Sequence, residues 1–406
     1  MRTRLEWPPH PKRRTTAVTA RSEEEGSGTV GRNRRAVRIV HLTSVHPPDD
    51  VRIYVKECQT LAAAGFDVTL VAPGEPRPPS DGVRLVAVRR PGSRLRRVTR
   101  TAIAVYRAAV RRRADIYHFH DPELIPVGLL LKLGGSHVIY DVHEDVPRQI
   151  LSKLWIRPTL RKPVAAMAAA VERVAACALD GIVTVTPAIA ARFPAAKTVL
   201  VHNYPMLSEM ARRPVQIPYR ERPPVVVYIG SLTAERGAHE LVRAMGLLNP
   251  RNDTRLILAV RVSPELEAAL AAESGWDHVT ATEWLSRAAV ADLLGRARVG
   301  IVTFLPVPNH VSAYPTKLFE YMAAGLPVVA SDFPVWREIV ERAGCGVLVD
   351  PEDPAAIASA IDRLLADPVA AEAMGERGRS AVQDRFNWET EAKALVAFYG
   401  RLSDGG

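Results

Sequence analysis

Apolar and polar positions alternate along the chain as short apolar runs separated by stretches with helical periodicity. From residue 36 onward the apolar runs are about four to eight residues long, the length typical of strands buried on both faces. Between them, apolar residues recur at the three- and four-residue spacing of an amphipathic helix. In the first half we expect strands at 36–43, 67–73, 82–88, 115–120, 137–142, 181–186 and 197–203, and helices at 51–64, 94–113, 122–133 and 160–178.

A proline-rich segment at 204–224 interrupts this alternation, which then starts again. We expect strands at 225–230, 255–260, 299–304, 327–331 and 346–349, and helices at 237–248, 285–296, 315–324 and from about 354 to the end. The pattern predicts an α/β protein with two doubly wound, Rossmann-like domains, at 36–203 and 225–386, joined by a linker at 204–224. Because ligands bind at the carboxyl ends of parallel strands, we expect a cleft between the two domains.

The net charge of +10 is concentrated in two places. Residues 1–35 carry nine Lys or Arg and four Glu, and residues 89–113 carry ten Arg and no acid, which leaves the remaining residues at −5. The first stretch is polar and rich in Pro, Ser and Gly, so we expect a disordered basic tail at 1–35. A nucleic-acid binder spreads its basic residues over one face, and no nucleic-acid motif is present, so we expect no nucleic-acid partner.

Cysteine usage and hydropathy indicate where the protein works. The chain has three widely spaced cysteines and no CxxC pair, which favours a reducing compartment. The tail lacks the apolar core of a secretory signal, and the best apolar run, at 124–133, is too short to span a bilayer. We therefore expect a cytoplasmic protein, soluble or peripheral to a membrane.

The segment 309–334 (NHVSAYPTKLFEYMAAGLPVVASDFP) is the strongest candidate for a binding site. Its loop offers Asn309, His310, Ser312, Thr316 and Lys317 before a helix, and helix amides beside a lysine favour an anion. One turn further, the Glu320 carboxylate can accept hydrogen bonds from a ribose; the alternative is a solvated Glu on an amphipathic helix. A second candidate is 230–237 (GSLTAERG), where backbone amides and Arg236 can face a phosphate, although a plain βα turn explains the same pattern.

Polar residues also gather at three strand ends of the first half. They are Ser44, His46, Asp49, Asp50 and Arg52; His118, His120 and Asp121; and Asp141, His143, Glu144 and Asp145. One such cluster could be a set of turn caps, but three at one sheet edge indicate a site. No metal-ligand spacing such as HExxH occurs, so we expect no metal.

Taken together, these segments resemble a known family. The segments on which the resemblance rests are TSVHPPDDVRIYVKECQTLAAAGFDVTLVAP, YDVHEDVPRQI, YIGSLTAERGAHELVRAM, PTKLFEYMAAGLPVVASDFPVWREIV and FNWETEAKALVAFYGRL. In order and spacing, the span 36–403 resembles the retaining family 4 glycosyltransferases with the GT-B fold, especially bacterial envelope-polysaccharide members. The resemblance implies a nucleotide-sugar donor held by the second domain, a glycan or polyprenyl-linked acceptor held by the first, and no cofactor. It also implies that a C-terminal helix at 387–406 packs back toward the first domain.

The resemblance assigns roles to donor-side residues. Glu320 matches the second Glu of the family's Glu-x7-Glu motif, which binds ribose, and the first Glu position falls on Ser312. The family's Arg/Lys pair on the diphosphate falls on Ser231 and Arg236, just after Gly230, and we expect Lys317 to supply the missing charge. Thr316 completes the expected donor side.

On the first domain, the family's active-site histidine matches His120 best, with His118 as the alternate, and is expected to hydrogen-bond the donor sugar or phosphate. His143, Glu144 and Asp145 are the candidates for orienting or deprotonating the acceptor hydroxyl. We place His46, Asp50, Arg52 and His118 on the acceptor side. HPPDD replaces the family's usual Gly-Gly loop after the first strand.

The arginine-rich helix at 94–113 suggests where the enzyme sits. Its arginines 94, 97, 100, 107 and 111 are interleaved with Leu95, Val98, Ala102, Ile103 and Val105, as in helices that lie on an anionic membrane. The alternative is a solvated helix. For function, the alternatives to a transferase are a GT-B sugar-nucleotide epimerase or hydrolase, or a non-catalytic subunit of a glycan assembly complex. We favour a transferase at the inner face of the cytoplasmic membrane.

Overall fold

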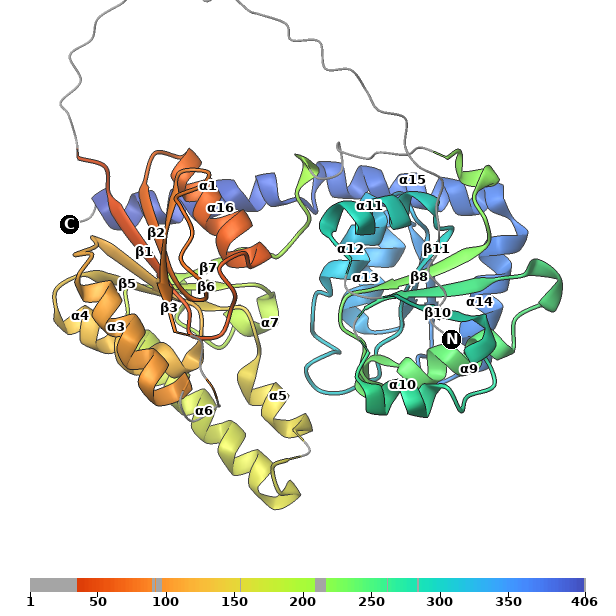
Figure 1. Ribbon diagram of the computed structural model, residues 1–406, viewed down its shortest axis with the longest axis horizontal. Helices are drawn as coiled ribbons and strands as arrows, with labels where there is room; N and C mark the ends of the chain where they lie inside the picture. The colour runs from red at the N-terminus through yellow and green to blue at the C-terminus, as the bar shows by residue number, and fades with distance from the viewer. Residues whose placement is uncertain are drawn as a thin grey trace, which may run out of the picture. The chain divides into compact units, whose positions relative to one another are not determined.

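The chain from Ala36 onward forms two parallel β-sheets, each covered by helices (Figure 1). The computed structural model describes residues 35–89, 92, 97–153, 155–208, 217–260, 262–282 and 285–404. The tail expected at 1–35 therefore lies outside the described residues except for Arg35, as do 209–216 of the linker and Arg94 and Leu95 of the arginine-rich helix. No helix in the described ranges is both long enough and apolar enough to cross a membrane.

The first sheet has seven parallel strands in the order β3-β2-β1-β4-β5-β6-β7. The strands are β1 (Arg38–Leu42), β2 (Asp67–Pro73), β3 (Val83–Val88), β4 (Ile116–Phe119), β5 (His137–Val142), β6 (Gly181–Thr184) and β7 (Thr198–Leu200). In the register of the central pair, His41 of β1 lies opposite His118 of β4. Nearly all side chains of β1, β4, β5 and β6 are buried, as expected for a sheet with helices on both faces.

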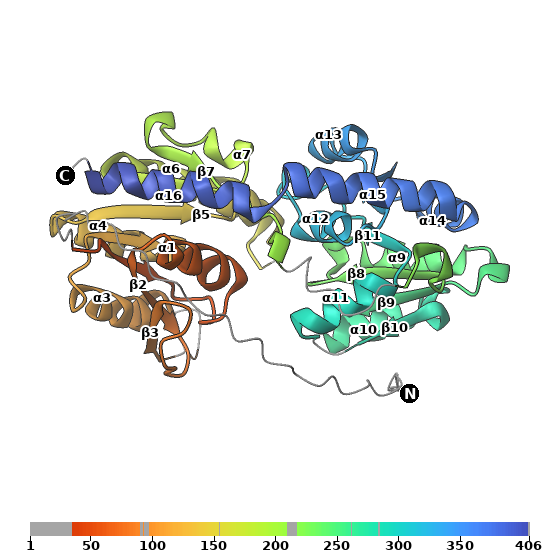
Figure 2. The ribbon, with the colours of Figure 1, turned by 90° about the horizontal axis from the view of Figure 1, so that it is seen from above.

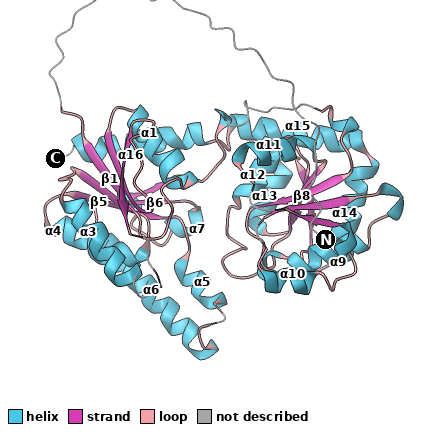
Figure 3. Ribbon diagram, in the orientation of Figure 1, coloured by secondary structure: helices cyan, strands magenta, loops and turns pink. Residues whose placement is uncertain are grey.

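Two helical layers cover this sheet (Figure 3). One layer contains α3 (Ala102–Val110), α4 (Ile125–Leu133) and α6 (Pro158–Ala178), whose buried residues share a core with β1, β4 and β5. The other contains η1 (Val51–Cys58), α1 (Gln59–Ala63) and α16 (Trp388–Asp404). Shorter helices connect the strands: η2 (Arg97–Thr101), η3 (Pro122–Leu124), α5 (Val146–Ser152), α7 (Pro187–Ala190) and η4 (Ala195–Lys197).

The second sheet has six parallel strands in the order β10-β9-β8-β11-β12-β13. They are β8 (Val225–Ile229), β9 (Arg255–Ala259), β10 (Val279–Ala281), β11 (Val299–Val302), β12 (Val328–Ser331) and β13 (Gly346–Val349). The helices are η5 (Tyr219–Glu221), η6 (Ala234–Arg236), α9 (Ala238–Gly246), η7 (Pro250–Asn252), α10 (Pro264–Leu270), η8 (Trp276–His278), α11 (Arg287–Arg296), α12 (Thr316–Ala323), α13 (Pro334–Ala343), α14 (Pro354–Ala366) and α15 (Pro368–Asp384).

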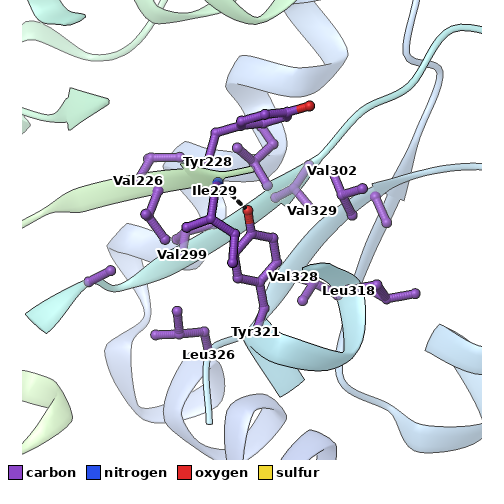
Figure 4. Packing of buried hydrophobic residues seen from close by; sticks show 14 of the residues in the cluster. Val226, Tyr228, Ile229, Val299, Val302, Leu318, Tyr321, Leu326, Val328 and Val329 are labelled. Carbon is purple, nitrogen blue, oxygen red and sulfur yellow. Dashed lines mark hydrogen bonds between the residues drawn. The ribbon is translucent and has the colours of Figure 1, made fainter. Parts of the chain in front are cut away.

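Helix α12 is fixed against the second sheet by its buried face (Figure 4). The hydroxyl of Tyr321 accepts a 3.0 Å hydrogen bond from the backbone N–H of Ile229, at the end of β8. Leu318 packs in the same core with Val299 and Val328. This contact holds the start of α12 close to the loop that follows β8, and both segments belong to the predicted donor site.

The C-terminal helix α16 belongs to the first sheet's core, although α15, just before it, packs on the second half (Figure 2). Leu395, Phe398 and Tyr399 lie in one apolar cluster with Ile39 and Ile139 of the first sheet. At its start, the indole N–H of Trp388 donates to Thr60 at 2.9 Å.

The main departures from the sequence prediction are short elements and helix boundaries. α10, α13 and β10 were not expected; β10 is only three residues long and lies at a sheet edge. The helix expected at 94–113 is described only from Arg97, and α3 ends at Val110. Ala102 and Val105, expected on an exposed apolar face, are buried against the sheet, so only Ile103 of that set is seen exposed.

Gly237 gives the fold a testable constraint. Its φ is +73°, and an added Cβ would lie 2.0 Å from the carbonyl oxygen of Thr303. We expect Gly237→Ala to lower the free energy of unfolding by about 3 kcal/mol or more, because the left-handed backbone and the backbone clash add. Urea unfolding measures this change.

Gly65→Ala is the matched control. Gly65 has a φ of +92° but open space around its added Cβ, so we expect a loss of about 1 kcal/mol. Equal losses in the two variants would show that the approach of Thr303 to Gly237 does not constrain the fold.

Candidate active site

A cavity of about 420 Å³ lies between residues of the two sheets' loops. Its first-half wall follows the carboxyl ends of β1, β5, β6 and β7, and its second-half wall is formed by η6, the end of β11 and the start of α12. The lining residues are His46, Asp50, Val51, Arg52, His143, Glu144, Asp145, Gln149, Val185, Thr186, Ile189, Asn203, Arg236, Phe304, Asn309, His310, Ser312, Ala313, Tyr314, Pro315, Thr316 and Lys317.

Two cationic side chains occupy the second-half wall. The guanidinium of Arg236 donates to the carbonyl oxygen of Ser231 at 2.8 Å and lies 5.2 Å from the centre of the Phe304 ring. Lys317 Nζ lies 3.5 Å from the centre of the Tyr228 ring and 5.2 Å from that of Phe304. The aromatic faces therefore hold both cations beside the cavity without neutralising them.

The Lys317 ammonium is electrostatically unsatisfied. The residue is only 6% exposed, and its Nζ has no hydrogen-bond partner among the described residues. Burial, and then the charge of Arg236, hold the pKa of Lys317 well below its usual value, and Glu320 opposes this only in part. An anion in the cavity would supply the missing partner.

The loop before α12 is fixed at several points. The indole N–H of Trp336 donates to Ala313 O at 2.7 Å, and the Nδ1 of His310 lies 3.2 Å from Leu305 O. Ser312 Oγ accepts a hydrogen bond from Arg148 of α5, which connects this loop to the first half. Ser312 therefore lines the cavity but already has a partner from the first half.

A buried ion pair organises the first-half wall. Arg52 Nε and one terminal nitrogen donate to the two oxygens of Asp141 at 2.9 and 2.8 Å. Burial would raise the pKa of Asp141, but the Arg52 charge and hydrogen bonds from His120 and His143 hold it well below its usual value. Asp50 caps η1 by accepting from the N–H groups of Arg52 and Ile53, both at 2.9 Å. This cap and this pair place η1 beside β5.

Two histidines of the cavity wall, His46 and His143, lie next to the Arg52–Asp141 ion pair. His143 Nδ1 lies 3.2 Å from Asp141 Oδ2, so it donates there and leaves Nε2 as an acceptor. His143 Nε2 is 3.3 Å from His46 Nε2, and His46 Nδ1 is 3.3 Å from Asp50. Burial lowers the pKa of His46, but the hydrogen bond to Asp50 and the charges of Asp121, Asp50 and Glu144 outweigh burial and raise it.

The neighbouring carboxylates differ in availability. Glu144 is exposed at the cavity, whereas Asp145 caps α5 through the N–H of Arg148 and pairs with Arg192 at 3.2 Å. Asp145 therefore has a structural task at the helix end and is the weaker candidate for a base.

Not all predicted site residues meet at the cavity. Those that line it are His46, Asp50, Arg52, His143, Glu144, Asp145, Arg236, Ser312, Thr316 and Lys317. Those that do not are His118, His120, Gly230, Ser231 and Glu320. Gly230 and Ser231 form the turn after β8, and Glu320 lies one turn into α12 beside Lys317.

His120, and His118 as its alternate, are expected to contact the donor, and the structure places both away from the cavity surface. Both imidazoles have no exposed surface and lie beneath the cavity. His120 Nδ1 is 3.0 Å from Asp141, and His118 Nδ1 is 2.6 Å from the hydroxyl of Tyr399. Residues two apart in a strand share one face, and this face of β4 packs against α16.

Two groups of side chains have the chemistry of metal ligands. They are His41, Glu57, His118 and His120, and His120, Asp141 and His143. In both groups the imidazoles already hydrogen-bond to one another, to Tyr399 or to Asp141. The lone pairs that a cation would need are therefore largely in use.

Sequence reasoning missed several residues of the site and its support. Thr186 and Asn203 line the cavity just after β6 and β7, so the rule used for the other strand ends would have found them. His41, Glu57 and Tyr399 complete the buried group beneath it. Tyr399 lies 281 residues from His118, and no local pattern links them.

The His46–Asp50 pair has a testable pH dependence. The same hydrogen bond that raises the pKa of His46 helps, against burial, to lower the pKa of Asp50 to about 2. The pair's stabilisation is therefore complete at pH 6, below the unfolded histidine pKa of about 6.5, and is lost as the pH rises through the raised folded pKa. We expect Asp50→Asn, which keeps a helix cap, to cost about 1 kcal/mol at pH 6 and less at pH 9.

Urea unfolding at both pH values measures this difference. Asp49→Asn is the control, since the Asp49 side chain is 62% exposed and 3.8 Å from Arg77. A cost for Asp50→Asn that is the same at pH 6 and pH 9 would contradict an ionised pair.

Both halves of the chain match models of known families. Residues 55–204 match the glycosyl transferase 4-like domain, and residues 210–381 match glycosyl transferases group 1. An MMP α-(1→4)-mannosyltransferase of Mycolicibacterium hassiacum is 26% identical over 318 residues, covering 72% of each chain. Other curated glycosyltransferases match over shorter regions, which span under half of those relatives' length.

Solved structures share the two-sheet architecture. A sucrose-phosphate synthase from Thermosynechococcus elongatus superposes with a TM-score of 0.71 at 22% identity, over 91% of this chain and all of that one. The HepE protein of Anabaena, solved with UDP and glucose, gives a TM-score of 0.68 at 15% identity over 90% of this chain and all of that one. With glycosyltransferase models on both halves and this fold throughout, the chain belongs to the glycosyltransferases of the GT-B type.

Proposed function

We propose that this enzyme is a retaining, family 4 glycosyltransferase that moves a sugar from a nucleoside diphosphate sugar to a glycan or lipid-linked acceptor of an envelope polysaccharide. The observation that carries the donor assignment is the buried, unpartnered Lys317 ammonium beside Arg236 at the cavity wall. A diphosphate would form charge-assisted hydrogen bonds with both cations. The relatives support this donor class, since one is a mannosyltransferase and HepE was solved with UDP.

Arg236 and Lys317 would act mainly on the leaving group. When the bond between the anomeric carbon and the diphosphate breaks, negative charge grows on the phosphate oxygens, and fixed cations stabilise it. We place Glu320 on the ribose and the Ser312–Thr316 loop near the donor sugar. No cofactor or metal is assigned, because the cavity's own cations can neutralise the diphosphate.

His143 is our choice for the acceptor side. Asp141 holds its Nδ1–H, and His46 Nε2 lies 3.3 Å from its Nε2. In the transfer reaction an acceptor hydroxyl would replace His46 at this nitrogen, and Nε2 would accept its proton as the new bond to the anomeric carbon forms. His46, Asp50 and Glu144 surround this position and would orient the acceptor. For retention, the hydroxyl attacks from the face that the diphosphate leaves, so positioning contributes more than a protein nucleophile.

Lys317→Met tests the donor assignment. Removing an unpaired buried charge should raise the free energy of unfolding, while loss of a charge-assisted hydrogen bond should weaken UDP or GDP binding about tenfold or more. Urea unfolding and calorimetric titration measure the two effects. Lys393→Met, an exposed position on α16, should change neither.

The donor panel is run on the same proteins. Wild-type enzyme with nucleotide sugars and an acceptor glycan should release nucleoside diphosphate and give a product with the donor's anomeric configuration, and Lys317→Met should reduce this release. Binding of no nucleoside diphosphate would overturn the proposal. Turnover that is equally fast without acceptor would show a hydrolase or epimerase instead.

We further propose that the enzyme meets its acceptor at an anionic membrane. It would contact this membrane through the layer of α3, α4 and α6 and not through the arginine-rich helix alone. Of 13 large apolar side chains exposed in the described residues, eight lie on these helices. They are Ile103, Val110, Leu130, Leu133, Leu160, Met167, Val171 and Val174. A ninth, Trp155, lies in the loop before α6. Such a concentration is unusual for a solvated surface.

The charge of this layer supports the same partner. Helix α6 has an outward stripe of Leu160, Met167, Val171 and Val174, spaced by seven, four and three residues, which places them on one face of the helix. Exposed basic residues of the same layer are Arg107 on α3, Arg111 to Arg113 directly after it, and Lys162 and Arg173 on α6, and Arg100 lies on η2 just before α3. The single acidic residue of the three helices, Glu172, is buried against Arg192. Apolar and basic groups without exposed acids favour an anionic bilayer surface at the cytoplasmic side.

Met167→Asp tests this surface. We expect sedimentation with phosphatidylglycerol-containing vesicles to fall at least about tenfold, because an apolar anchor is replaced by a repelled charge. Leu247→Asp is the control, since Leu247 is similarly exposed (57% against 62%) but follows α9 in the second half. Equal binding by both variants and the wild type would exclude this layer as the membrane contact.

A further inference from the structure

Beneath the cavity lies a buried imidazole cluster made of His41, His118 and His120, which the hydroxyl of Tyr399 joins. His41 comes from β1, His118 from β4, His120 from the position directly after β4, and Tyr399 from the C-terminal helix α16. The three imidazoles and the tyrosine side chain are fully enclosed. The transfer mechanism proposed above uses none of these four side chains, so their arrangement needs its own explanation.

The hydrogen bonds of the cluster run in one direction. Asp141 is ionised, so His120 Nδ1, at 3.0 Å, must donate to it, and His120 Nε2 is left as an acceptor. That acceptor is 2.9 Å from His41 Nδ1, which must then carry a proton. His41 Nε2 in turn accepts from the Tyr399 hydroxyl at 3.3 Å. The Tyr399 oxygen accepts from His118 Nδ1–H at 2.6 Å.

This pattern requires neutral rings, and burial provides them. Burial lowers the pKa of each of His41, His118 and His120. Neighbouring imidazoles lower it further, and Asp141 opposes the shift without reversing it. A neutral imidazole has one donor and one acceptor nitrogen, so fixing one hydrogen bond fixes the other. The chain ends at His118 Nε2, which has no partner among the described residues.

The opposite end of the chain reaches the cavity. Asp141 Oδ2 accepts from His120 and also from His143, which lines the cavity. Arg52 holds the same carboxylate from the other side. If His120 adopted the other tautomer, its Nδ1 lone pair would face Asp141 Oδ2 and repel it. The carboxylate would then move away from His143.

We propose that Tyr399 is a positioning residue for the transfer reaction: its hydroxyl is the partner of the His41 Nε2 lone pair, and through His41 and His120 it supports the Asp141 carboxylate that orients His143. This inference rests on the proposed role of His143 as the acceptor base. Helix α16 directly follows α15, which packs on the second half. Its Tyr399 nevertheless completes the hydrogen-bond chain beneath the first-half wall of the cavity.

A divalent cation is the competing explanation of the cluster. Glu57 Oε2 lies 3.9, 3.9 and 4.0 Å from His41 Nδ1, His118 Nδ1 and His120 Nε2, and neither Glu57 oxygen has a hydrogen-bond partner among the described residues. Glu57 Oε1 is 3.1 Å from Arg52, which already satisfies Asp141. A bound cation would remove the protons from His41 Nδ1 and His118 Nδ1, so the two explanations predict different tautomers.

The experiment uses the full chain with ¹⁵N-labelled histidine and compares wild type, Tyr399→Phe and Tyr219→Phe. Nitrogen–proton correlation spectra distinguish Nδ1–H from Nε2–H rings. In wild type we expect Nδ1–H at His41, His118, His120 and His143. In Tyr399→Phe we expect His41 and His120 to keep Nδ1–H, because Asp141 sets their tautomers. We expect kcat to fall about tenfold while KM for the nucleotide sugar stays within about twofold, because His41 has lost the group that holds its Nε2.

Tyr219→Phe is the matched control. It removes another buried hydroxyl, whose partner is Arg298 O at 2.8 Å in the second half, and should leave the cluster's tautomers unchanged. Nδ1 lone pairs at His41 and His118 in wild type, or bound metal in the purified protein, would overturn the proposal, and so would a kcat of Tyr399→Phe equal to that of wild type.

The spectra test the hydrogen-bond chain, and the kinetics test the proposed function. A wild type that shows the expected tautomers but transfers no sugar would contradict the proposed function and leave the hydrogen-bond chain standing. Should Tyr399→Phe not fold, the wild-type tautomers still decide between the chain and the cation.

Discussion

The buried ion pair of Arg52 and Asp141 is the interaction on which the first-half site depends. Taking both charges out of water is costly, so the pair must be well hydrogen-bonded to persist. Both Asp141 oxygens accept from Arg52, and one also accepts from two histidines. The pair thereby joins η1 to β5 and fixes the direction of every hydrogen bond around it, including the one that orients His143.

The second half solves a different electrostatic problem. There the cations lie against aromatic rings, and Glu320 offsets the charge of Lys317 only in part, so Lys317 and Arg236 remain available for an anion. In the first-half wall the charges are paired and the positions of the protons are fixed. The second-half wall keeps cations that can bind an anion. This division matches the needs of glycosyl transfer, in which the acceptor must lose a proton and the leaving group must gain negative charge.

The sequence was sufficient for the two sheets and for most of the cavity wall, because strand runs and the polar residues that follow them are local signals. It was insufficient for His118 and His120. Their position in the chain shows that they follow the strand alternation, but not that the face they share is covered by α16. Likewise, Lys317 could be named from its loop, whereas its isolation over Tyr228 depends on how α12 packs on β8.

The placement of Tyr399 has a consequence for how the protein is made. Synthesis proceeds from the N-terminus, so both sheets can form while the last helix is still inside the ribosome. Tyr399 follows the entire second half in the chain, yet it occupies the core of the domain that is synthesised first. The first-half wall can therefore be completed only after the second half has been synthesised, and a chain cut before α16 would have its second-half wall but an unfinished first-half wall.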